Sequence, residues 1–267
     1  MVFESKKYYL ITKKHYKMKR LNLLFATLLI SFLSLNAQDM TMDEVLENYY
    51  EVMGFDKLKD VNTVTMTGKS INQGMETPFT IITVRPDKYR LEVEIQGQKM
   101  IQVYNVGTGW YVAPWTGSLD AQDLPPEQLK SMKRQADIEG SLYNYKEKGH
   151  KAEFLGIDDL EGTEVYKIKL TFDDGDAGTY FIDAENFVVL KEESLINMRG
   201  QEIKSEVLFS DFKPIEDMIM PFSFQTLMNG QVGQIINIET VEYDNKVDMN
   251  IFEKPAPAPV AEETEEK

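Results

Sequence analysis

The chain has 267 residues, a length that fits one large β domain or two small ones. It carries 44 acidic and 29 basic residues, for a net charge of −15, and it contains no cysteine. The negative charge repels nucleic acid and anionic lipid surfaces, so neither is an expected partner. The lack of cysteine excludes disulfides, thiolate metal sites, a cysteine nucleophile and a lipidated N-terminal cysteine.

Residues 1–37 are typical of a secretory signal peptide. The basic stretch Met18–Arg20 precedes an apolar run from Leu21 to Leu35, and Ala37 supplies the small residue at the predicted cut. Residues 1–17 precede this start and indicate a misassigned start codon. The apolar run is too short for a membrane span. Cleavage removes seven basic residues and one acid, so the exported chain has a net charge of −21.

Two amphipathic helices are expected, and each has recognisable ends. The first follows the capping box Thr41–Glu44 and ends at Gly54. The second begins at Leu124-Pro125-Pro126, because proline is tolerated in the first turn of a helix, and it ends at Gly140. Shorter helical segments are expected at residues 56–59 and 141–145.

The segment from Tyr89 to Ile95 shows how the strands are built. Its odd positions are apolar and its even positions are Arg90, Glu92 and Glu94, so the strand has one apolar and one charged face. Gln96-Gly97 then turns the chain into the next strand. The strands expected in this first run are residues 61–71, 78–84, 89–95, 100–105 and 109–113.

A second run of strands occupies the chain from residue 151 onward. Tyr166–Phe172 shows the same alternation, and Asn229-Gly230 is a strong hairpin signal. Pro214 and Pro221 interrupt the strand pattern, so residues 211–219 are predicted to form a loop. Further turns are expected at residues 173–176, 183–186 and 199–200.

These elements predict a mainly β (α+β) fold with about eleven or twelve strands in two runs. A large antiparallel sheet with one apolar face must cover that face, and only two or three short helices are available. We therefore expect a curved antiparallel sheet, an unclosed half-barrel, with the helices as a lid over its concave apolar face. Residues 38–254 form this single domain. Residues 255–267 are an acidic Pro/Ala tail that we expect to be disordered.

The sequence offers no group of residues suited to catalysis, metal binding or a cofactor. His150 has no partner at a metal-binding spacing. Asp173–Asp176 lacks the closing acidic ligand of a calcium loop, so a hairpin turn is predicted. Asp158-Asp159 and Glu192-Glu193 are adjacent pairs whose side chains diverge in a strand, and we interpret both pairs as solvated charge. An esterase or glycan hydrolase would need a nucleophile–base pair that the sequence does not supply.

Two segments resemble the LolA-like lipoprotein carriers. Arg85-Pro86-Asp87-Lys88-Tyr89, followed by a charged-alternating strand and by Trp110-Tyr111, is similar to the Arg-Pro-x-x-aromatic motif and the aromatic strand of that family. Val247–Phe252, with Pro255 after it, is similar to the family's last segment. The resemblance covers most of residues 40–255. The chain departs from the family in its greater length and in its acidic tail.

The resemblance implies a fold, a location and a function. Members of the family are open half-barrels with a helical lid, and they carry acyl chains through the periplasm. This chain would then be a non-enzymatic, monomeric periplasmic carrier of an acylated lipoprotein or lipid, with an inner-membrane donor and an outer-membrane acceptor. Arg85 matches the family arginine that bonds to the lid helices and helps to hold the lid shut.

The apolar strand faces allow two interpretations. A sheet under helices is normally a filled core. Its large apolar area and the twelve methionines after residue 37, a flexible residue common on surfaces that repack, favour a ligand cavity once the resemblance is added. The alternative is an envelope sensor or scaffold that fills the cavity itself and binds a protein partner. The predicted ligand-binding residues are Tyr89, Leu91, Val93, Ile95, Trp110, Leu129, Met132, Tyr166, Ile168, Leu170, Phe222 and Phe224.

Overall fold

The computed structural model describes residues 40–117, 119–198 and 201–256. The chain divides into two units, Met1–Thr41 and Met42–Lys267, and the fold is that of the second unit. The predicted signal peptide at 1–37 and its start at Met18 lie outside the described residues, as do the turn at 199–200 and nearly all of the acidic tail.

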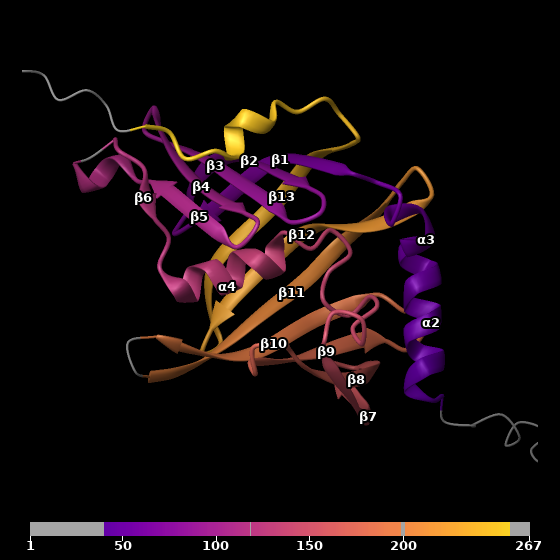
Figure 1. Cartoon of the computed structure of the whole chain (residues 1–267). Coiled ribbons are helices and arrows are strands. Elements are labelled where there is room, and N and C mark those ends of the chain that lie inside the picture. The colour runs from indigo at the N-terminus through magenta and orange to yellow at the C-terminus, as the bar shows by residue number, and fades with distance from the viewer. Residues whose placement is uncertain (1–39, 118, 199–200, 257–267) are drawn as a thin grey trace, which may run out of the picture. The chain divides into compact units, whose positions relative to one another are not determined.

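One antiparallel sheet contains all thirteen strands of the described residues (Figure 1). The strand order is β6-β5-β4-β3-β2-β1-β13-β12-β11-β10-β9-β8-β7, so each run is a meander and the pairing of β1 with β13 joins the two runs. Strands β6 and β7 are the two edges, and the sheet is not closed into a barrel. The first run is β1 (Thr63–Asn72), β2 (Met75–Val84), β3 (Lys88–Ile95), β4 (Gln98–Asn105), β5 (Thr108–Val112) and β6 (Gln122–Asp123). The second run is β7 (Lys151–Leu160), β8 (Thr163–Thr171), β9 (Ala177–Asp183), β10 (Val189–Met198), β11 (Gln201–Ile215), β12 (Met218–Met228) and β13 (Gln231–Tyr243).

Few helices accompany this sheet, and all are short. They are α2 (Met42–Met53), α3 (Phe55–Leu58), α4 (Pro126–Gln135) and the 3-10 turns η1 (Pro114–Thr116) and η2 (Met249–Phe252). Helix α4 contacts β3 and β4, whereas α2 and α3 contact β12. Figure 1 shows α4 lying across one face of the sheet, which we call the inner face, and the opposite face is the outer face. None of the described helices has the length and apolar character needed to cross a membrane.

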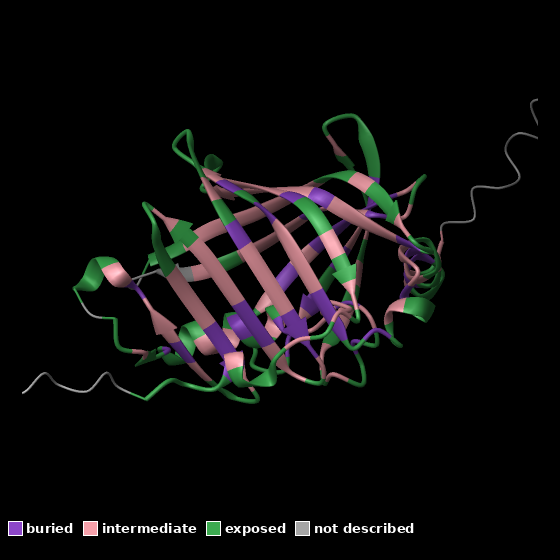
Figure 2. Cartoon of the chain, turned by 90° about the horizontal axis from the view of Figure 1, so that it is seen from above, coloured by how far each residue is buried: buried purple, intermediate pink, exposed green. Residues whose placement is uncertain are grey.

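Alternating strands sort their residues onto the two faces, as the sequence predicts. Tyr89 lies opposite Tyr104, and both are buried beneath α4 on the inner face. Arg90, the next residue, lies opposite Val103, and Val103 lies opposite Trp110 on the outer face. In Figure 2 buried positions on the strands are interrupted mainly by intermediate ones, and exposed positions lie mostly at strand ends and in loops.

Two local predictions are wrong. Residues 211–219 are not a loop, because β11 and β12 continue through them to a tight turn after Ile215. Pro214 is tolerated because the β10–β11 pairing ends at Leu208, and Pro221 because the β12–β13 pairing begins only at Ser223. Each proline therefore lies where its strand pairs with a neighbour on one side only. The N–H that proline lacks is not needed for hydrogen bonds to a second strand. The helical segment expected at 141–145 is a series of turns.

The inner face contains a row of side chains that crosses four strands. Phe79 and Ile238 lie on either side of Gly68 in the strand register, and both pack with Phe222. A Cβ atom at Gly68 would lie 2.8 Å from the Phe79 ring and 2.2 Å from the Asn237 carbonyl oxygen. Glycine is therefore required at this position by the close approach of its neighbours.

The C-terminal segment covers part of the outer face. Phe252 in η2 is fully buried against Val84, Val103 and Trp110, and the Trp110 Nε1–H donates to the Phe252 carbonyl oxygen at 3.0 Å. The resemblance at Val247–Phe252 thus falls on a segment that seals the outer face of β2, β4 and β5.

We expect Phe252→Ala to lower the free energy of unfolding by about 3–5 kcal/mol, because it leaves a cavity among fully buried side chains. Met249→Ala in the same 3-10 turn is the matched control: Met249 is 44% exposed, so its loss should stay within about 0.5 kcal/mol. Urea unfolding of both variants measures the difference. Equal small losses would show that the segment does not seal the sheet.

Candidate functional site

Two cavities lie between the inner face of the sheet and the helical segments. The larger has a volume of about 670 Å³ and the smaller about 300 Å³. They share a wall formed by Tyr49, Met53, Gln135, Gly140 and Pro221. Both volumes fall within the range of roughly 300–1,000 Å³ that small-molecule sites occupy.

The floor of the larger cavity is set by the register of three strands. Glu192 on β10 lies opposite Val207 on β11, which lies opposite Thr226 on β12. One step along, a second row consists of Ser194, Ser205 and Met228. All six side chains line the cavity, because residues two apart on a strand share a face. The floor is therefore a mixture of small polar and apolar groups.

The opposite wall comes from the helices and from the turns that follow α4, which we call the lid (residues 126–149). Ser131, Arg134 and Gln135 of α4 line the cavity, as does Leu142 from the turns after it. Helix α2 contributes Tyr49 and Met53, and the floor continues with Phe209 and Phe212 of β11. In the described part of the chain, the larger cavity is thus enclosed by α2, by the lid and by strands of the second run.

A carboxyl group stands in the larger cavity. Burial raises the pKa of Glu192, and the hydroxyl of Tyr180 and the charge of Arg134 offset this only in part. Tyr180, whose hydroxyl acts on the pKa of Glu192, lines the same cavity, as does Ser141 of the lid. Tyr49 lies close enough for the Glu192 charge to act on its pKa, which burial already raises. The polar group that the cavity presents to a ligand is therefore an acid that is hard to ionise.

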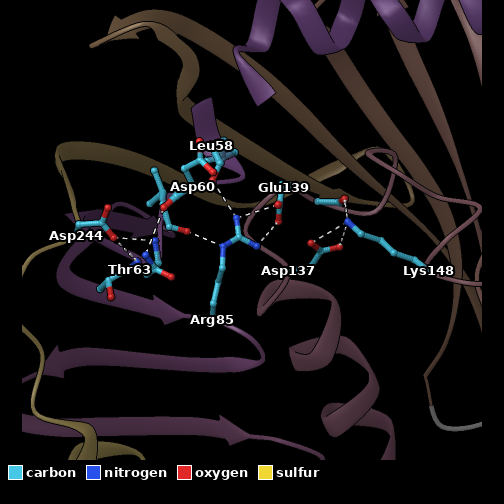
Figure 3. Close-up of polar contacts among 11 residues, drawn as sticks. Leu58, Asp60, Thr63, Arg85, Asp137, Glu139, Lys148 and Asp244 are labelled. Atoms are coloured by element: carbon cyan, nitrogen blue, oxygen red, sulfur yellow. Dashed lines mark hydrogen bonds and ion pairs between the residues drawn. The ribbon is translucent and has the colours of Figure 1, made fainter. Parts of the chain in front are cut away.

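The predicted contact of Arg85 with the helical segments is present (Figure 3). Its guanidinium donates through Nη1 and Nη2 to the Glu139 carboxylate at 2.9 and 2.8 Å, a bidentate pair. It also donates to the carbonyl oxygens of Leu58 at 2.9 Å and Val61 at 2.6 Å. The Glu139 side chain is only 10% exposed, so solvent screens this pair weakly. Arg85 thus joins the end of α3 to the lid.

A second set of ion pairs ties the lid to the turn between β8 and β9. Lys133 pairs with Asp173 at 2.9 Å, and Arg134 pairs with Asp174 at 2.9 Å and Asp176 at 3.3 Å. The predicted hairpin turn at 173–176 is confirmed, and its acids bind the last turn of α4 rather than solvent alone. Cations at a helix C-terminus are also favoured by the helix dipole.

His150 has a structural place beside the same turn. Its Nδ1 accepts the Asp173 backbone N–H at 3.1 Å, and its ring lies edge-on to Phe172 with centroids 5.4 Å apart. Burial lowers its pKa. In the described residues no group of three or more His, Cys, Asp or Glu side chains is placed to hold a metal ion.

The structure distributes the predicted ligand-binding residues over several places. Of the twelve, Phe224 alone lines either of the two cavities. Tyr89, Leu91, Leu129 and Met132 belong to one packed cluster between α4 and strands β3 and β4. The others on the inner side of the sheet are Val93 and Phe222 beside Phe79, half-buried Ile95 at the end of β3, and Tyr166, Ile168 and Leu170, buried on β8.

Two interpretations of the sequence need correction. Trp110 is not with the other predicted contacts, because its strand register turns it to the outer face, under Phe252. Glu192 is not solvated charge, because it faces the cavity, whereas Glu193 faces outward and pairs with Lys191 at 2.9 Å and Lys204 at 3.1 Å. The sequence did contain a signal for this. Ser194 and Ile196 lie on the same face of the strand as Glu192, and both also line the cavity.

We expect Arg85→Leu to accelerate amide hydrogen exchange in residues 136–149 by about tenfold or more, because charged hydrogen bonds are each worth about 1.5–3 kcal/mol. Lys69→Leu is the control with the same charge change, since Lys69 is 48% exposed and makes only long pairs, 3.4 Å to Glu76 and 3.7 Å to Glu239. Exchange of the lid amides by mass spectrometry measures the effect. Unchanged exchange in Arg85→Leu would show that Arg85 does not hold the lid.

Glu192→Gln and Glu193→Gln should change stability in opposite directions at pH 7. The raised pKa of Glu192 means that the folded state holds its proton more tightly, so stability falls as pH rises above the ordinary value of 4.5. Glutamine cannot ionise, so the variant does not lose stability as the pH rises. Glu192→Gln should therefore be more stable than wild type at pH 7 but not below pH 4.5.

For Glu193, burial acts to raise the pKa, but hydrogen bonds from Lys191 and Lys204 lower it overall. Its contribution to stability is present above pH 4.5 and is lost as pH falls, so Glu193→Gln should be less stable than wild type at pH 7. Urea unfolding between pH 4 and pH 8 tests both variants. Destabilisation of both at pH 7 would contradict the burial of Glu192.

Neither a protein-family model nor a curated protein matches the chain. Several solved structures share its fold. A DUF1329 family protein from Desulfovibrio piger is 10% identical, with a TM-score of 0.55 over 78% of this chain and 97% of that chain. A domain described as an outer membrane lipoprotein-sorting protein, from Vibrio parahaemolyticus, is 13% identical, with a TM-score of 0.53 over 78% of this chain and 96% of that chain.

A LolA superfamily protein from Nitrosomonas europaea is 14% identical, with a TM-score of 0.55 over 80% of this chain and 98% of that chain. Identities this low relate the proteins by fold and not by function. The fold predicted from the sequence is confirmed: this chain has a LolA-like fold.

Proposed function

We propose that the protein is a non-catalytic carrier that holds the acyl chains of a lipoprotein or lipid in the larger cavity. The observation that carries the proposal is a cavity of about 670 Å³ between the inner face of the sheet and a lid. Its walls are mainly apolar, with Phe209, Phe212, Ile196, Val207 and Met228 among them. A concave site of this kind suits an apolar ligand with one polar end.

The energy of acyl binding is sufficient for a carrier. Each buried CH₂ contributes about 0.8 kcal/mol, so a chain of about sixteen carbons offers about 12 kcal/mol before the costs of ordering are subtracted. The wall between the two cavities contains Met53 and Gln135, two unbranched side chains. Rotation of Met53, which is flexible, would connect the cavities and admit a longer chain. Lid opening against the Arg85 and Asp173–Asp176 contacts would permit release.

The fold and the N-terminal sequence support a location and partners for this carrier. A signal peptide at 1–37 would export the chain to the periplasm, and an outer-membrane sorting role is part of the description of one structural neighbour. By analogy, an inner-membrane donor would load the carrier and an outer-membrane acceptor would unload it. No reaction is required of the carrier, which acts as a monomer.

A second candidate, a scaffold that binds a protein partner, is favoured by one observation. The inner face beneath α4 is filled by the protein's own side chains, with Tyr89, Tyr104, Leu124, Met132 and Ala136 all buried there. A self-filled fold has no need of a ligand. The larger cavity, which is lined in part by the turns after α4, favours the carrier.

Mass spectrometry of organic extracts separates the two candidates. Protein purified without detergent from the periplasm of its own cells should carry a stoichiometric lipid or acylated peptide if it is a carrier. A clean extract, together with no uptake of an uncharged fluorescent acyl ester, would favour the scaffold.

Substitution of two neighbouring residues tests the position of the site. Ser194→Trp places a bulky ring in the cavity, so binding of the fluorescent acyl ester should weaken by about tenfold or more. Leu195→Trp is the control, because Leu195 points outward and is 65% exposed. Thermal unfolding establishes that both variants are folded. Full binding by folded Ser194→Trp would mean that the ligand lies elsewhere.

A further inference from the structure

The Glu192 carboxyl group inside the larger cavity indicates which head groups a ligand can have. Glu192 stands between Val207 and Ser194 on the cavity floor, within a wall that also contains Tyr180 and Ser141. The Glu192 carboxyl group lies beside Gly178 of β9, where an added Cβ atom would be 3.3 Å from the Glu192 Oε1. It also has no ion-pair partner within 4.0 Å among the described residues, whereas its neighbour Glu193 has two.

The carboxyl group of Glu192 shares the cavity wall with Tyr180 and Ser141. Burial raises the pKa of Glu192, and the neighbouring Tyr180 hydroxyl lowers it to a smaller extent. A negative charge on this side chain is therefore disfavoured, and a second negative charge beside it would be disfavoured further. An ester or amide head group adds no charge.

The cation nearest to this group is already engaged. Arg134 attracts Glu192, but its guanidinium pairs with Asp174 and Asp176 and lies 4.8 Å from the centroid of the Phe172 ring. The other titratable groups that face Glu192 are Tyr180 of β9 and Tyr49 of α2, and burial raises the pKa of each. Among the described residues that line the larger cavity, Arg134 is the only cation, and it is already paired with two aspartates.

We propose that Glu192 selects acyl ligands with an uncharged ester or amide head group and rejects free fatty acid anions. The proposal rests on the proposed function, that acyl chains occupy the larger cavity. A carboxylate placed beside Glu192 would bring two acids together in a site of low polarity, and both cannot ionise there without a large cost. An ester carries no charge, so it can bind beside Glu192 without this cost.

Three probes of equal chain length test the selection: dodecanoic acid, its methyl ester and dodecylamine. At about pH 8 the free acid is ionised, and titration calorimetry or displacement of a neutral fluorescent acyl ester gives the affinity of each probe. The wild-type protein should bind the methyl ester at least about tenfold more tightly than the acid. Equal affinities for the ester and the acid, or a preference for the acid over the amine, would overturn the selection.

The variants assign the selection to one side chain. Glu192→Gln should strengthen binding of the acid by about tenfold and leave binding of the ester within about twofold, because glutamine matches the size of glutamate and cannot ionise. Glu193→Gln is the matched control, since Glu193 faces outward, and it should keep the wild-type preference. A folded Glu192→Gln that still rejects the acid would overturn the assignment.

The outcomes also separate this inference from the proposed function. If the wild-type protein binds none of the three probes, the acyl-carrier proposal fails, and the selection by Glu192 fails with it. If it binds ester and acid alike, the carrier proposal stands and the selection alone is overturned. The comparison of probes on the wild-type protein needs no variant, so it can overturn the inference even if Glu192→Gln folds poorly.

Discussion

The pairing of β1 with β13 is the constraint on which the rest of the structure depends. It places Val64 opposite Tyr243 and so brings the first strand of the chain beside the last one. The Asp244 side chain reinforces the junction by accepting the backbone N–H groups of Asn62 at 2.7 Å and Thr63 at 3.1 Å (Figure 3). Without this pairing the two strand runs would form separate sheets, and the smaller cavity, which is lined by Val64 of β1 and Phe224 of β12, would lose one of its walls.

The lid is attached to both of the runs that this junction unites. Arg85 follows β2, and its backbone N–H donates to the Asn62 carbonyl oxygen at 2.9 Å, while its side chain holds Glu139 of the lid. On the other side, the turn between β8 and β9 holds α4 through Arg134 and Asp174. Charged hydrogen bonds of this kind are stronger than neutral ones. The lid is therefore held by charged contacts on two sides, to Arg85 and to the turn between β8 and β9.

The chemistry of the inner face changes from one half to the other. Beneath α4, tyrosine and methionine side chains such as Tyr89 and Met132 fill the space, whereas beneath the turns after α4 the strands present Ser194, Ser205 and Thr226. Small side chains leave volume that large ones would fill, which places the cavity on the second strand run. The polar atoms of these small residues also make the cavity a better site for a ligand with a head group than for a bare hydrocarbon.

Much of the fold could be predicted from the sequence because strand and helix signals are local. The alternation from Tyr89 to Ile95, the proline start of α4 and the hairpin at Asn229-Gly230 each depend on neighbours in the chain, and the structure contains all three elements. The contact between Arg85 and the helical segments came from a resemblance rather than from periodicity. The prediction of a loop at 211–219 failed because strand pairing on only one side, which tolerates proline, is not visible in the sequence.

The sequence by itself determined that each strand has two unlike faces and that few helices are available to cover one of them. The tertiary structure decided which residues of the covered face meet a cavity and which meet a packed helix, because that depends on register between strands far apart in the chain. Glu192 and Glu193 illustrate the difference. Adjacent residues on a strand must point to opposite faces, but only the position of β10 between β9 and β11 places one carboxyl group in a cavity and the other among lysines.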